Sequence, residues 1–184
     1  MKLALALSFL LLAAPALAWK ADLGLPRPAP VVDEAGLLDG AQSARLDRML
    51  RAVKERSGVE VSVFIPSSLR ELPIEDFSLA TAEEWKLGRK KEDKGLLFVI
   101  APKERKMRLE VGYGLEGEIT DAFSRRVLDN VVRPYLAEGR YDEGILAGLM
   151  AIQEKLNLGI QADEAPAARA EEVQVGRGMH GFVM

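Results

Sequence analysis

Apolar residues at helical spacing predict the first long helix of the chain. Asp39 precedes the spaced residues, and its carboxylate can accept from the free amides of a first helical turn. Gly58 follows them, as expected for a glycine that ends a helix. Between these two residues, positions i, i+3, i+4 and i+7 are apolar and form one face. The residues of that face are Leu46, Met49, Leu50 and Val53.

Shorter apolar patterns predict the strands. Residues 59–65 alternate in the manner of a strand and end at a proline, and residues 96–100 form a continuous apolar run, typical of a central buried strand. Residues 107–111 alternate again after a turn and indicate a hairpin partner of that run. A short strand is expected at residues 31–33.

Three further helices are predicted, at about residues 74–86, from the N-cap Thr120 onward, and at about residues 141–156. Pro134 is expected to interrupt the second of them. The order of elements favours an α/β class fold, a three-layer α/β/α sandwich around a small mixed sheet. The first full strand and the apolar strand should be parallel through a right-handed crossover. The apolar stripe of the interrupted helix is Phe123, Val127, Leu128 and Val131.

The two ends of the chain differ in composition from the part between them. Residues 1–18 combine Lys2, a short apolar run and a final Ala-Leu-Ala, which is typical of a cleaved signal peptide and too short for a membrane span. Residues 19–30 carry three prolines and read as an extended leader. Residues 31–160 are the predicted domain, and residues 161–184 have the composition of a disordered tail. The protein is therefore expected to be exported, in a periplasmic or other extracytoplasmic location.

Composition excludes several kinds of chemistry. The chain has no cysteine, so disulfides, thiol catalysis and thiolate–metal sites are ruled out. Its one histidine, His180, lies in the tail, which argues against Ser-His-Asp hydrolases and His-ligated zinc sites. The formal net charge of −3 gives no basic face for nucleic acid.

A glycine-rich segment at residues 112–117, Gly-Tyr-Gly-Leu-Glu-Gly, matches the spacing of a dinucleotide-binding turn. It follows the return arm of a hairpin instead of the first strand of a βαβ unit, and Glu116 would face the pyrophosphate with negative charge. The alternative, which we favour, is a glycine turn with positive φ angles.

Acidic residues gather around that turn. Glu110, Glu116, Glu118 and Asp121 lie within twelve positions, and Asp33 and Asp93 lie at the ends of other segments, Asp93 just before the apolar strand run. Carboxylates together with turn carbonyls suit a hard cation such as Ca²⁺ or Mg²⁺. The alternative is that Asp121 is only a first-turn helix residue, favoured there by the helix dipole, and that the glutamates are solvated.

A charged run at residues 86–94 has two interpretations. Arg89 and Lys94 could bind a phosphate or another anion, but a solvated loop is the more common meaning of such a run. Trp85, just before it, is expected in the core or in the wall of a pocket.

Several blocks of the sequence together resemble the TPM domain. They are Val-Asp-Glu-Ala-Gly-Leu-Leu from residue 32, Trp-Lys-Leu-Gly from residue 85, Asp-Lys-Gly-Leu-Leu from residue 93, and Arg-Leu-Glu-Val-Gly-Tyr-Gly-Leu-Glu-Gly-Glu-Ile-Thr-Asp from residue 108. Pro-Tyr at 134 and Gly-Arg-Tyr-Asp-Glu-Gly from residue 139 complete the resemblance, which spans about residues 31–158.

The resemblance implies an α/β/α sandwich in an exported or membrane-tethered protein, and it implies calcium binding or acid phosphatase activity, both attributed to plant members. Carried over to this chain, the implied metal ligands are Asp33, Asp93, Glu110, Glu116 and Asp121. Gly112, Gly114 and Gly117 would shape that site. Two departures stand out: Lys94 replaces a frequent asparagine, and no transmembrane segment follows the domain, although residues 181–184 could border a missing C-terminal span.

The resulting hypothesis is an exported binding or maintenance module of the cell envelope that takes a divalent cation, Ca²⁺ ahead of Mg²⁺. An envelope protein is a possible partner, and no nucleic acid is expected. One alternative is a weak metal-assisted acid phosphatase in which Arg89 or Lys94 steers the phosphate. The other is a metal-free scaffold.

Overall fold

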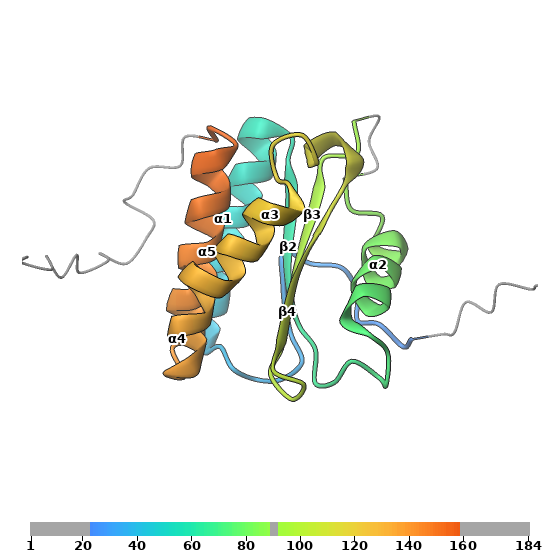
Figure 1. The fold of residues 1–184 in the computed structure, drawn as a ribbon, viewed down its shortest axis with the longest axis vertical. Coiled ribbons are helices and arrows are strands. Elements are labelled where there is room, and N and C mark those ends of the chain that lie inside the picture. The colour runs from blue at the N-terminus through green and yellow to red at the C-terminus, as the bar shows by residue number, and fades with distance from the viewer. Residues whose placement is uncertain (1–22, 89–91, 159–184) are drawn as a thin grey trace, which may run out of the picture.

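The computed structural model describes residues 23–88 and 92–158. The predicted signal peptide at residues 1–18, the start of the leader, Arg89 and the predicted tail at residues 161–184 lie outside these ranges. Within them the chain forms a sheet with helices on both sides, so the predicted three-layer α/β/α sandwich is confirmed (Figure 1).

The sheet has four strands in the order β1-β2-β3-β4. β1 (Val31–Asp33), β2 (Glu60–Ile65) and β3 (Gly95–Ala101) are parallel, and β4 (Lys106–Val111) returns antiparallel to β3. Both predicted pairings are therefore confirmed. β3 is buried along its whole length, as its continuous apolar run predicts. β2 is buried on both faces as well, because Phe64 on its second face packs beneath a helix instead of facing water.

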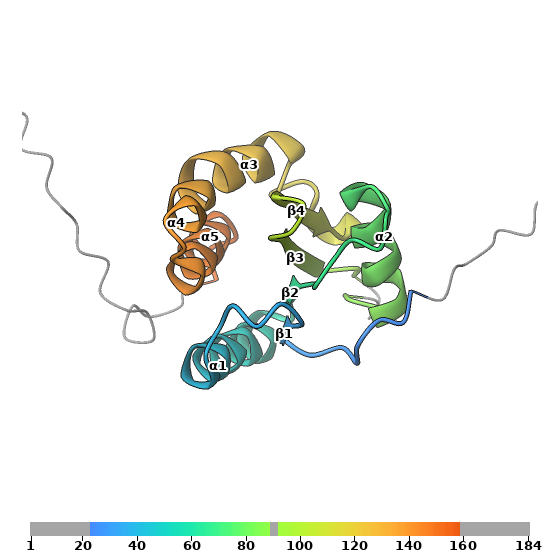
Figure 2. The same ribbon diagram turned by 90° about the horizontal axis from the view of Figure 1, so that it is seen from below.

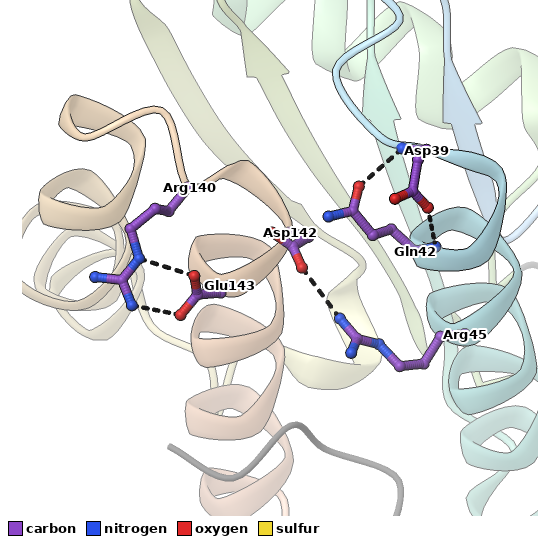
Figure 3. A network of polar contacts seen from close by, with 6 residues as sticks. All are labelled: Asp39, Gln42, Arg45, Arg140, Asp142 and Glu143. Atoms are coloured by element: carbon purple, nitrogen blue, oxygen red, sulfur yellow. Dashed lines mark hydrogen bonds and ion pairs between the residues drawn. The ribbon is translucent and has the colours of Figure 1, made fainter. Parts of the chain in front are cut away.

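Helix α1 (Gly40–Ser57) begins and ends where the sequence predicts. The carboxylate of Asp39 accepts from the amide of Gln42 at 2.8 Å, and the Gln42 side chain accepts from the amide of Asp39 at 2.8 Å (Figure 3). These two bonds form a reciprocal capping box. Gly58 ends the helix at φ 74°. The predicted apolar face is fully confirmed, since its members are the buried residues of the helix: Leu46, Met49, Leu50 and Val53.

One face of the sheet is covered by α1, α5 (Tyr141–Lys155) and the helical segments between Asp121 and Ala137 (Figure 2). α1 and α5 are joined near their amino ends by an ion pair in which Arg45 Nη2 lies 3.2 Å from Asp142 Oδ2 (Figure 3). Their apolar faces pack on the sheet with Ile145, Leu149 and Ile152 almost fully buried. This larger core holds the domain together.

The other face is covered by the single helix α2 (Ile74–Trp85) and by the extended residues 23–30 (Figure 2). Trp85 is 7% exposed, and its ring centroid lies 5.1 Å from that of Phe64. Trp85 therefore lies in the core, which is one of its two predicted places. On this face α2 lies beside β3 and β4 and contacts both strands.

The predicted interruption at Pro134 is wrong. The helix that begins at Thr120 continues through α3 (Asp121–Arg126), a π-helical segment (Val127–Val132) and α4 (Arg133–Ala137). A proline ring clashes with the carbonyl group four residues earlier, and the wider π turn relieves that contact without ending the helix. The wider turn also changes which side chain points inward, so Val132 is fully buried.

None of the helices between residues 23 and 88 or between 92 and 158 is long and apolar enough to cross a membrane.

Candidate functional site

A cleft of about 320 Å³ opens between α2 and the ends of β3 and β4. It lies at the end of the sheet where β3 starts and β4 finishes. Leu97 contributes to its floor, and Leu79 and Ala82 of α2 form one wall. The charged residues that line it within the described part of the chain are all acidic, so we call it the acidic cleft: Glu83, Asp93, Glu110 and Glu116.

The glycine turn forms the opposite wall. Its glycines are needed for a reason other than the predicted positive φ angles. Gly112, Gly114 and Gly117 are not among the glycines with positive φ. Instead, a Cβ on Gly112 would lie 2.4 Å from the Asp93 carbonyl oxygen, and one on Gly114 would lie 1.9 Å from the Glu92 carbonyl oxygen. These glycines are required because two backbones approach closely. Gly117 has open space around it and is not needed for this approach.

Asp93 is held against this turn. Its backbone takes a left-handed conformation at φ 49°, and its carbonyl oxygen accepts from the Gly114 amide at 3.1 Å. Its carboxylate oxygen Oδ2 accepts from the Tyr113 amide at 3.2 Å. Asp93 therefore lines the cleft, and its other carboxylate oxygen has no hydrogen bond to the residues that the structure describes.

Glu110 projects from β4 into the same cleft and already has a cationic partner. Arg108, two residues earlier on the same face of the strand, donates from Nε to Glu110 Oε2 at 2.8 Å. The Glu110 side chain is only 16% exposed, whereas that of Arg108 is 36% exposed. A cation entering the cleft would compete with this guanidinium for the carboxylate.

Glu83 was not predicted, although it lines the cleft together with the exposed Glu116. Its helical spacing from Leu79 and Ala82 is the only sequence signal, since i, i+3 and i+4 share a helix face. That spacing does not tell which face lies beside β4. Leu79 and Tyr113 at the rim are 50% and 80% exposed, so the acidic cleft has an apolar edge.

Asp33 and Asp93 lie at opposite ends of the sheet. β1, β2 and β3 are parallel, and Asp33 is at the carboxyl end of β1, whereas Asp93 precedes the amino end of β3. The six residues of β2 separate the two ends by roughly 20 Å. The carboxylate oxygens of Asp33 accept from the amides of Gly36 and Leu38, each at 2.8 Å. Asp33 therefore stabilises the connection to α1 and does not join the acidic cleft.

Asp121 is likewise outside the cleft. It is the exposed first residue of α3, where the helix dipole stabilises its negative charge. It lines a separate surface depression with Arg125 and Asp129. Of the predicted ligands, the fold thus brings Asp93, Glu110 and Glu116 to one cleft and leaves Asp33 and Asp121 elsewhere.

The donor chemistry of the acidic cleft suits a hard cation, since carboxylate oxygens are its preferred ligands. The arrangement is not a preformed metal site: among the residues that the structure describes, no group of three acidic or histidine side chains is placed to hold a metal ion. Lys94, one of the predicted anion-binding residues, forms an ion pair with Glu92. The hydrogen bond from Lys94 lowers the pKa of the exposed Glu92 carboxyl below its ordinary value.

The chain matches the TPM domain over residues 31–155. The protein belongs to the TPM domain family. No curated protein matches the chain. Among solved structures, it is 34% identical to the N-terminal domain of a protein from P. gingivalis, with a TM-score of 0.64 over 72% of this chain and 94% of that one.

Two more distant TPM-like structures show the fold alone. The N-terminal domain of the cg2496 protein from Corynebacterium glutamicum is 17% identical, with a TM-score of 0.56 over 77% of this chain and 89% of that one. The BA42 protein from the psychrophilic bacterium Bizionia argentinensis is 16% identical, with a TM-score of 0.56 over 67% of this chain and 86% of that one. The α/β/α arrangement of this TPM domain is thus shared across distant bacteria.

Proposed function

We propose that this TPM domain is an exported binding module of the cell envelope whose ligand site is the acidic cleft. The observation that carries the proposal is the convergence of Asp93, Glu110 and Glu116, from three separate parts of the chain, on one cleft of about 320 Å³. The proposed ligand is a divalent cation, Ca²⁺ ahead of Mg²⁺, because Ca²⁺ accepts irregular sets of oxygen ligands.

Binding in this proposal is coupled to a rearrangement. The carboxylates do not form a ready-made cluster, and Glu110 is paired with Arg108. The side chain of Glu110 has to leave the guanidinium before it can turn to a cation. This requirement predicts modest affinity, since the lost ion pair offsets part of the binding free energy.

Calorimetric titration of Ca²⁺ and of Mg²⁺ into residues 19–184 tests the proposal. The double variant Asp93→Asn with Glu110→Gln should abolish the heat of binding. Asp121→Asn is the matched control, because Asp121 is acidic, exposed and outside the cleft. Loss of binding in Asp121→Asn alone would place the site elsewhere, and absence of binding in the unmodified chain would end the cation proposal.

The phosphatase alternative is not favoured by the charges around the cleft. Among the described residues, its lining contains four carboxylates and no basic side chain, so this part of the cleft would repel the dianion of a phosphate ester unless a metal ion came first. Arg89 lies outside the described residues, and Lys94 is paired with Glu92. We expect no turnover of a chromogenic phosphate ester with or without Ca²⁺, and metal-dependent turnover lost in Asp93→Asn would establish the enzyme instead.

A further inference from the structure

A second cleft lies at the other end of the sheet and is opposite in charge. It has a volume of about 520 Å³ and opens between the β3–β4 hairpin turn and the junction of α4 with α5. In Figure 1 the hairpin turn and α4 lie at the lower end of the molecule, away from the glycine turn. We call it the basic cleft after its charged lining residues: Arg105, Lys106 and Arg133.

The remainder of its lining is mainly apolar. Ile100 and Met107 come from the paired strands, Pro102 from the turn, and Leu136 and Tyr141 from the helices. No acidic side chain is among the described residues that line it. A cavity of this size, with apolar walls and a few charged groups, is typical of sites for small organic ligands.

Two of the three cations have no neutralising partner among the residues that the structure describes. No ion pair or side-chain hydrogen bond is found for Arg105 or Lys106 within residues 23–88 and 92–158, whereas Arg133 lies 2.6 Å from Asp129. Glu104, the carboxylate next to Arg105, accepts instead from the amide of Leu69 at 3.0 Å. The positive charge at the mouth of the basic cleft is therefore uncompensated.

The position of the basic cleft agrees with a ligand site. The turn at Pro102 follows the carboxyl end of β3, and ligands of open α/β sheets bind outside the carboxyl ends of the strands. The acidic cleft is at the opposite end, so the two sites do not share a lining residue.

We propose that the basic cleft binds a small soluble organic anion that has an apolar body. Its carboxylate or similar group contacts Arg105 and Lys106, and its aromatic or aliphatic part packs on Met107, Leu136 and Tyr141. A guanidinium fork gives such an anion directional, charge-assisted hydrogen bonds. This proposal is independent of cation binding in the acidic cleft, because it rests on other residues.

The test uses three probes in parallel, 4-phenylbutyrate, the neutral 4-phenylbutan-1-ol and inorganic phosphate, titrated into residues 19–184 and followed by amide and methyl NMR shifts. Phenylbutyrate should bind with a dissociation constant of roughly 0.1 to 10 mM, as expected for so small a ligand. It should shift Met107 and Leu136. The alcohol and phosphate should each bind at least about tenfold more weakly, because each lacks one half of the recognised group.

Two variants and a control make the test specific. Arg105→Gln with Lys106→Gln removes the free charges, and Ala137→Glu places a carboxylate on the exposed wall of the cleft; each should weaken binding about tenfold. Lys103→Gln, in the same turn but outside the lining, should keep the affinity.

The proposal fails if the alcohol binds equally, which would indicate an apolar crevice only, or if phosphate binds equally, which would indicate an unspecific charge patch. It also fails if Lys103→Gln weakens binding as much as the double variant. If the protein does not bind phenylbutyrate but sediments with phosphatidylglycerol vesicles, its ligand is a lipid surface and the proposal is wrong.

Discussion

The indole Nε1 of Trp85 donates a hydrogen bond of 3.0 Å to the carbonyl oxygen of Pro26. This contact fastens the extended segment before β1 to the end of α2. Leu23 and Leu25 pack against the same core, and Arg70 Nη2 donates to the Gly24 carbonyl at 3.4 Å. The predicted leader is thus, from residue 23 onward, a part of the folded domain.

Replacing Trp85 should therefore destabilise the domain. Trp85→Phe loses the hydrogen bond to Pro26 and part of the ring that packs on Phe64, and we expect a loss of about 1 to 3 kcal/mol in the free energy of unfolding. Urea denaturation measures it. Leu79→Ala, a half-exposed residue of the same helix, is the control and should change stability by less than about 1 kcal/mol.

The glycine turn gives a second test of stability. Gly112→Ala and Gly114→Ala force a Cβ against the carbonyl oxygens of Asp93 and Glu92, and each should cost about 2 to 4 kcal/mol. Gly117→Ala meets no atom and should be neutral or stabilise by up to about 1 kcal/mol, because it restricts the unfolded chain. Thermal unfolding of the three variants shows whether the glycines are needed for the close approach of two backbones or for their conformational freedom. An equal loss at Gly117 would contradict this explanation.

Arg108 should act as a competitor of the proposed cation. Arg108→Gln removes the guanidinium that holds Glu110, so affinity for Ca²⁺ should rise roughly three- to tenfold, as expected for loss of one partly exposed like charge. Calorimetry compares this variant with the unmodified chain. Arg125→Gln is the control, because Arg125 lies in a different surface depression. Unchanged affinity in Arg108→Gln would show that Glu110 is not a ligand.

Asp33 should matter for stability and not for binding. Asp33→Ala removes both acceptors of the Gly36 and Leu38 amides, and we expect a cost of about 1 to 3 kcal/mol. Cation affinity, measured well below the unfolding temperature, should stay the same. A selective loss of Ca²⁺ binding would return Asp33 to the site.

The start of α5 provides a pH-dependent contact. Arg140 donates from Nε to Glu143 at 2.8 Å, and this hydrogen bond lowers the pKa of the Glu143 carboxyl below its ordinary value (Figure 3). A lowered pKa means that the contact stabilises the folded state above the ordinary value and that its contribution is lost as the pH falls through the folded-state pKa. Carboxyl-carbon NMR should give a titration midpoint below the ordinary value of a glutamate, and Arg140→Gln should raise the midpoint toward that ordinary value.

Much of this fold could be read from local patterns. Helix α1 could be predicted with its cap, its buried face and its final glycine, because a 3.6-residue period and the capping residues are both local in sequence. Pro134 misled the same reasoning, since a π turn accommodates the ring without ending the helix. Such a turn depends on packing against the sheet and has no simple sequence signature.

The candidate site was only partly predictable. The cluster of carboxylates around the glycine turn could be seen in the sequence, and Asp93, Glu110 and Glu116 do share a cleft. Asp33 was included because it lies at the end of a short segment and because the family resemblance implies it, but the directions of the strands place it at the far end of the sheet. Glu83 was not predicted, because the sequence does not show that the crossover helix α2 packs beside β4.

The sequence by itself determined the family, the elements and the strand pairing, because hydrophobic periodicity fixes which side of each element is buried and a short hairpin forces an antiparallel return. Only the tertiary structure decided which charges gather at each end of the sheet. The glycines let the turn approach Asp93, so acidic side chains converge there, while the β3–β4 turn carries Arg105 and Lys106 to the opposite end. Charge at a site depends on where strands begin and end in space, and that placement is a property of the packed layers.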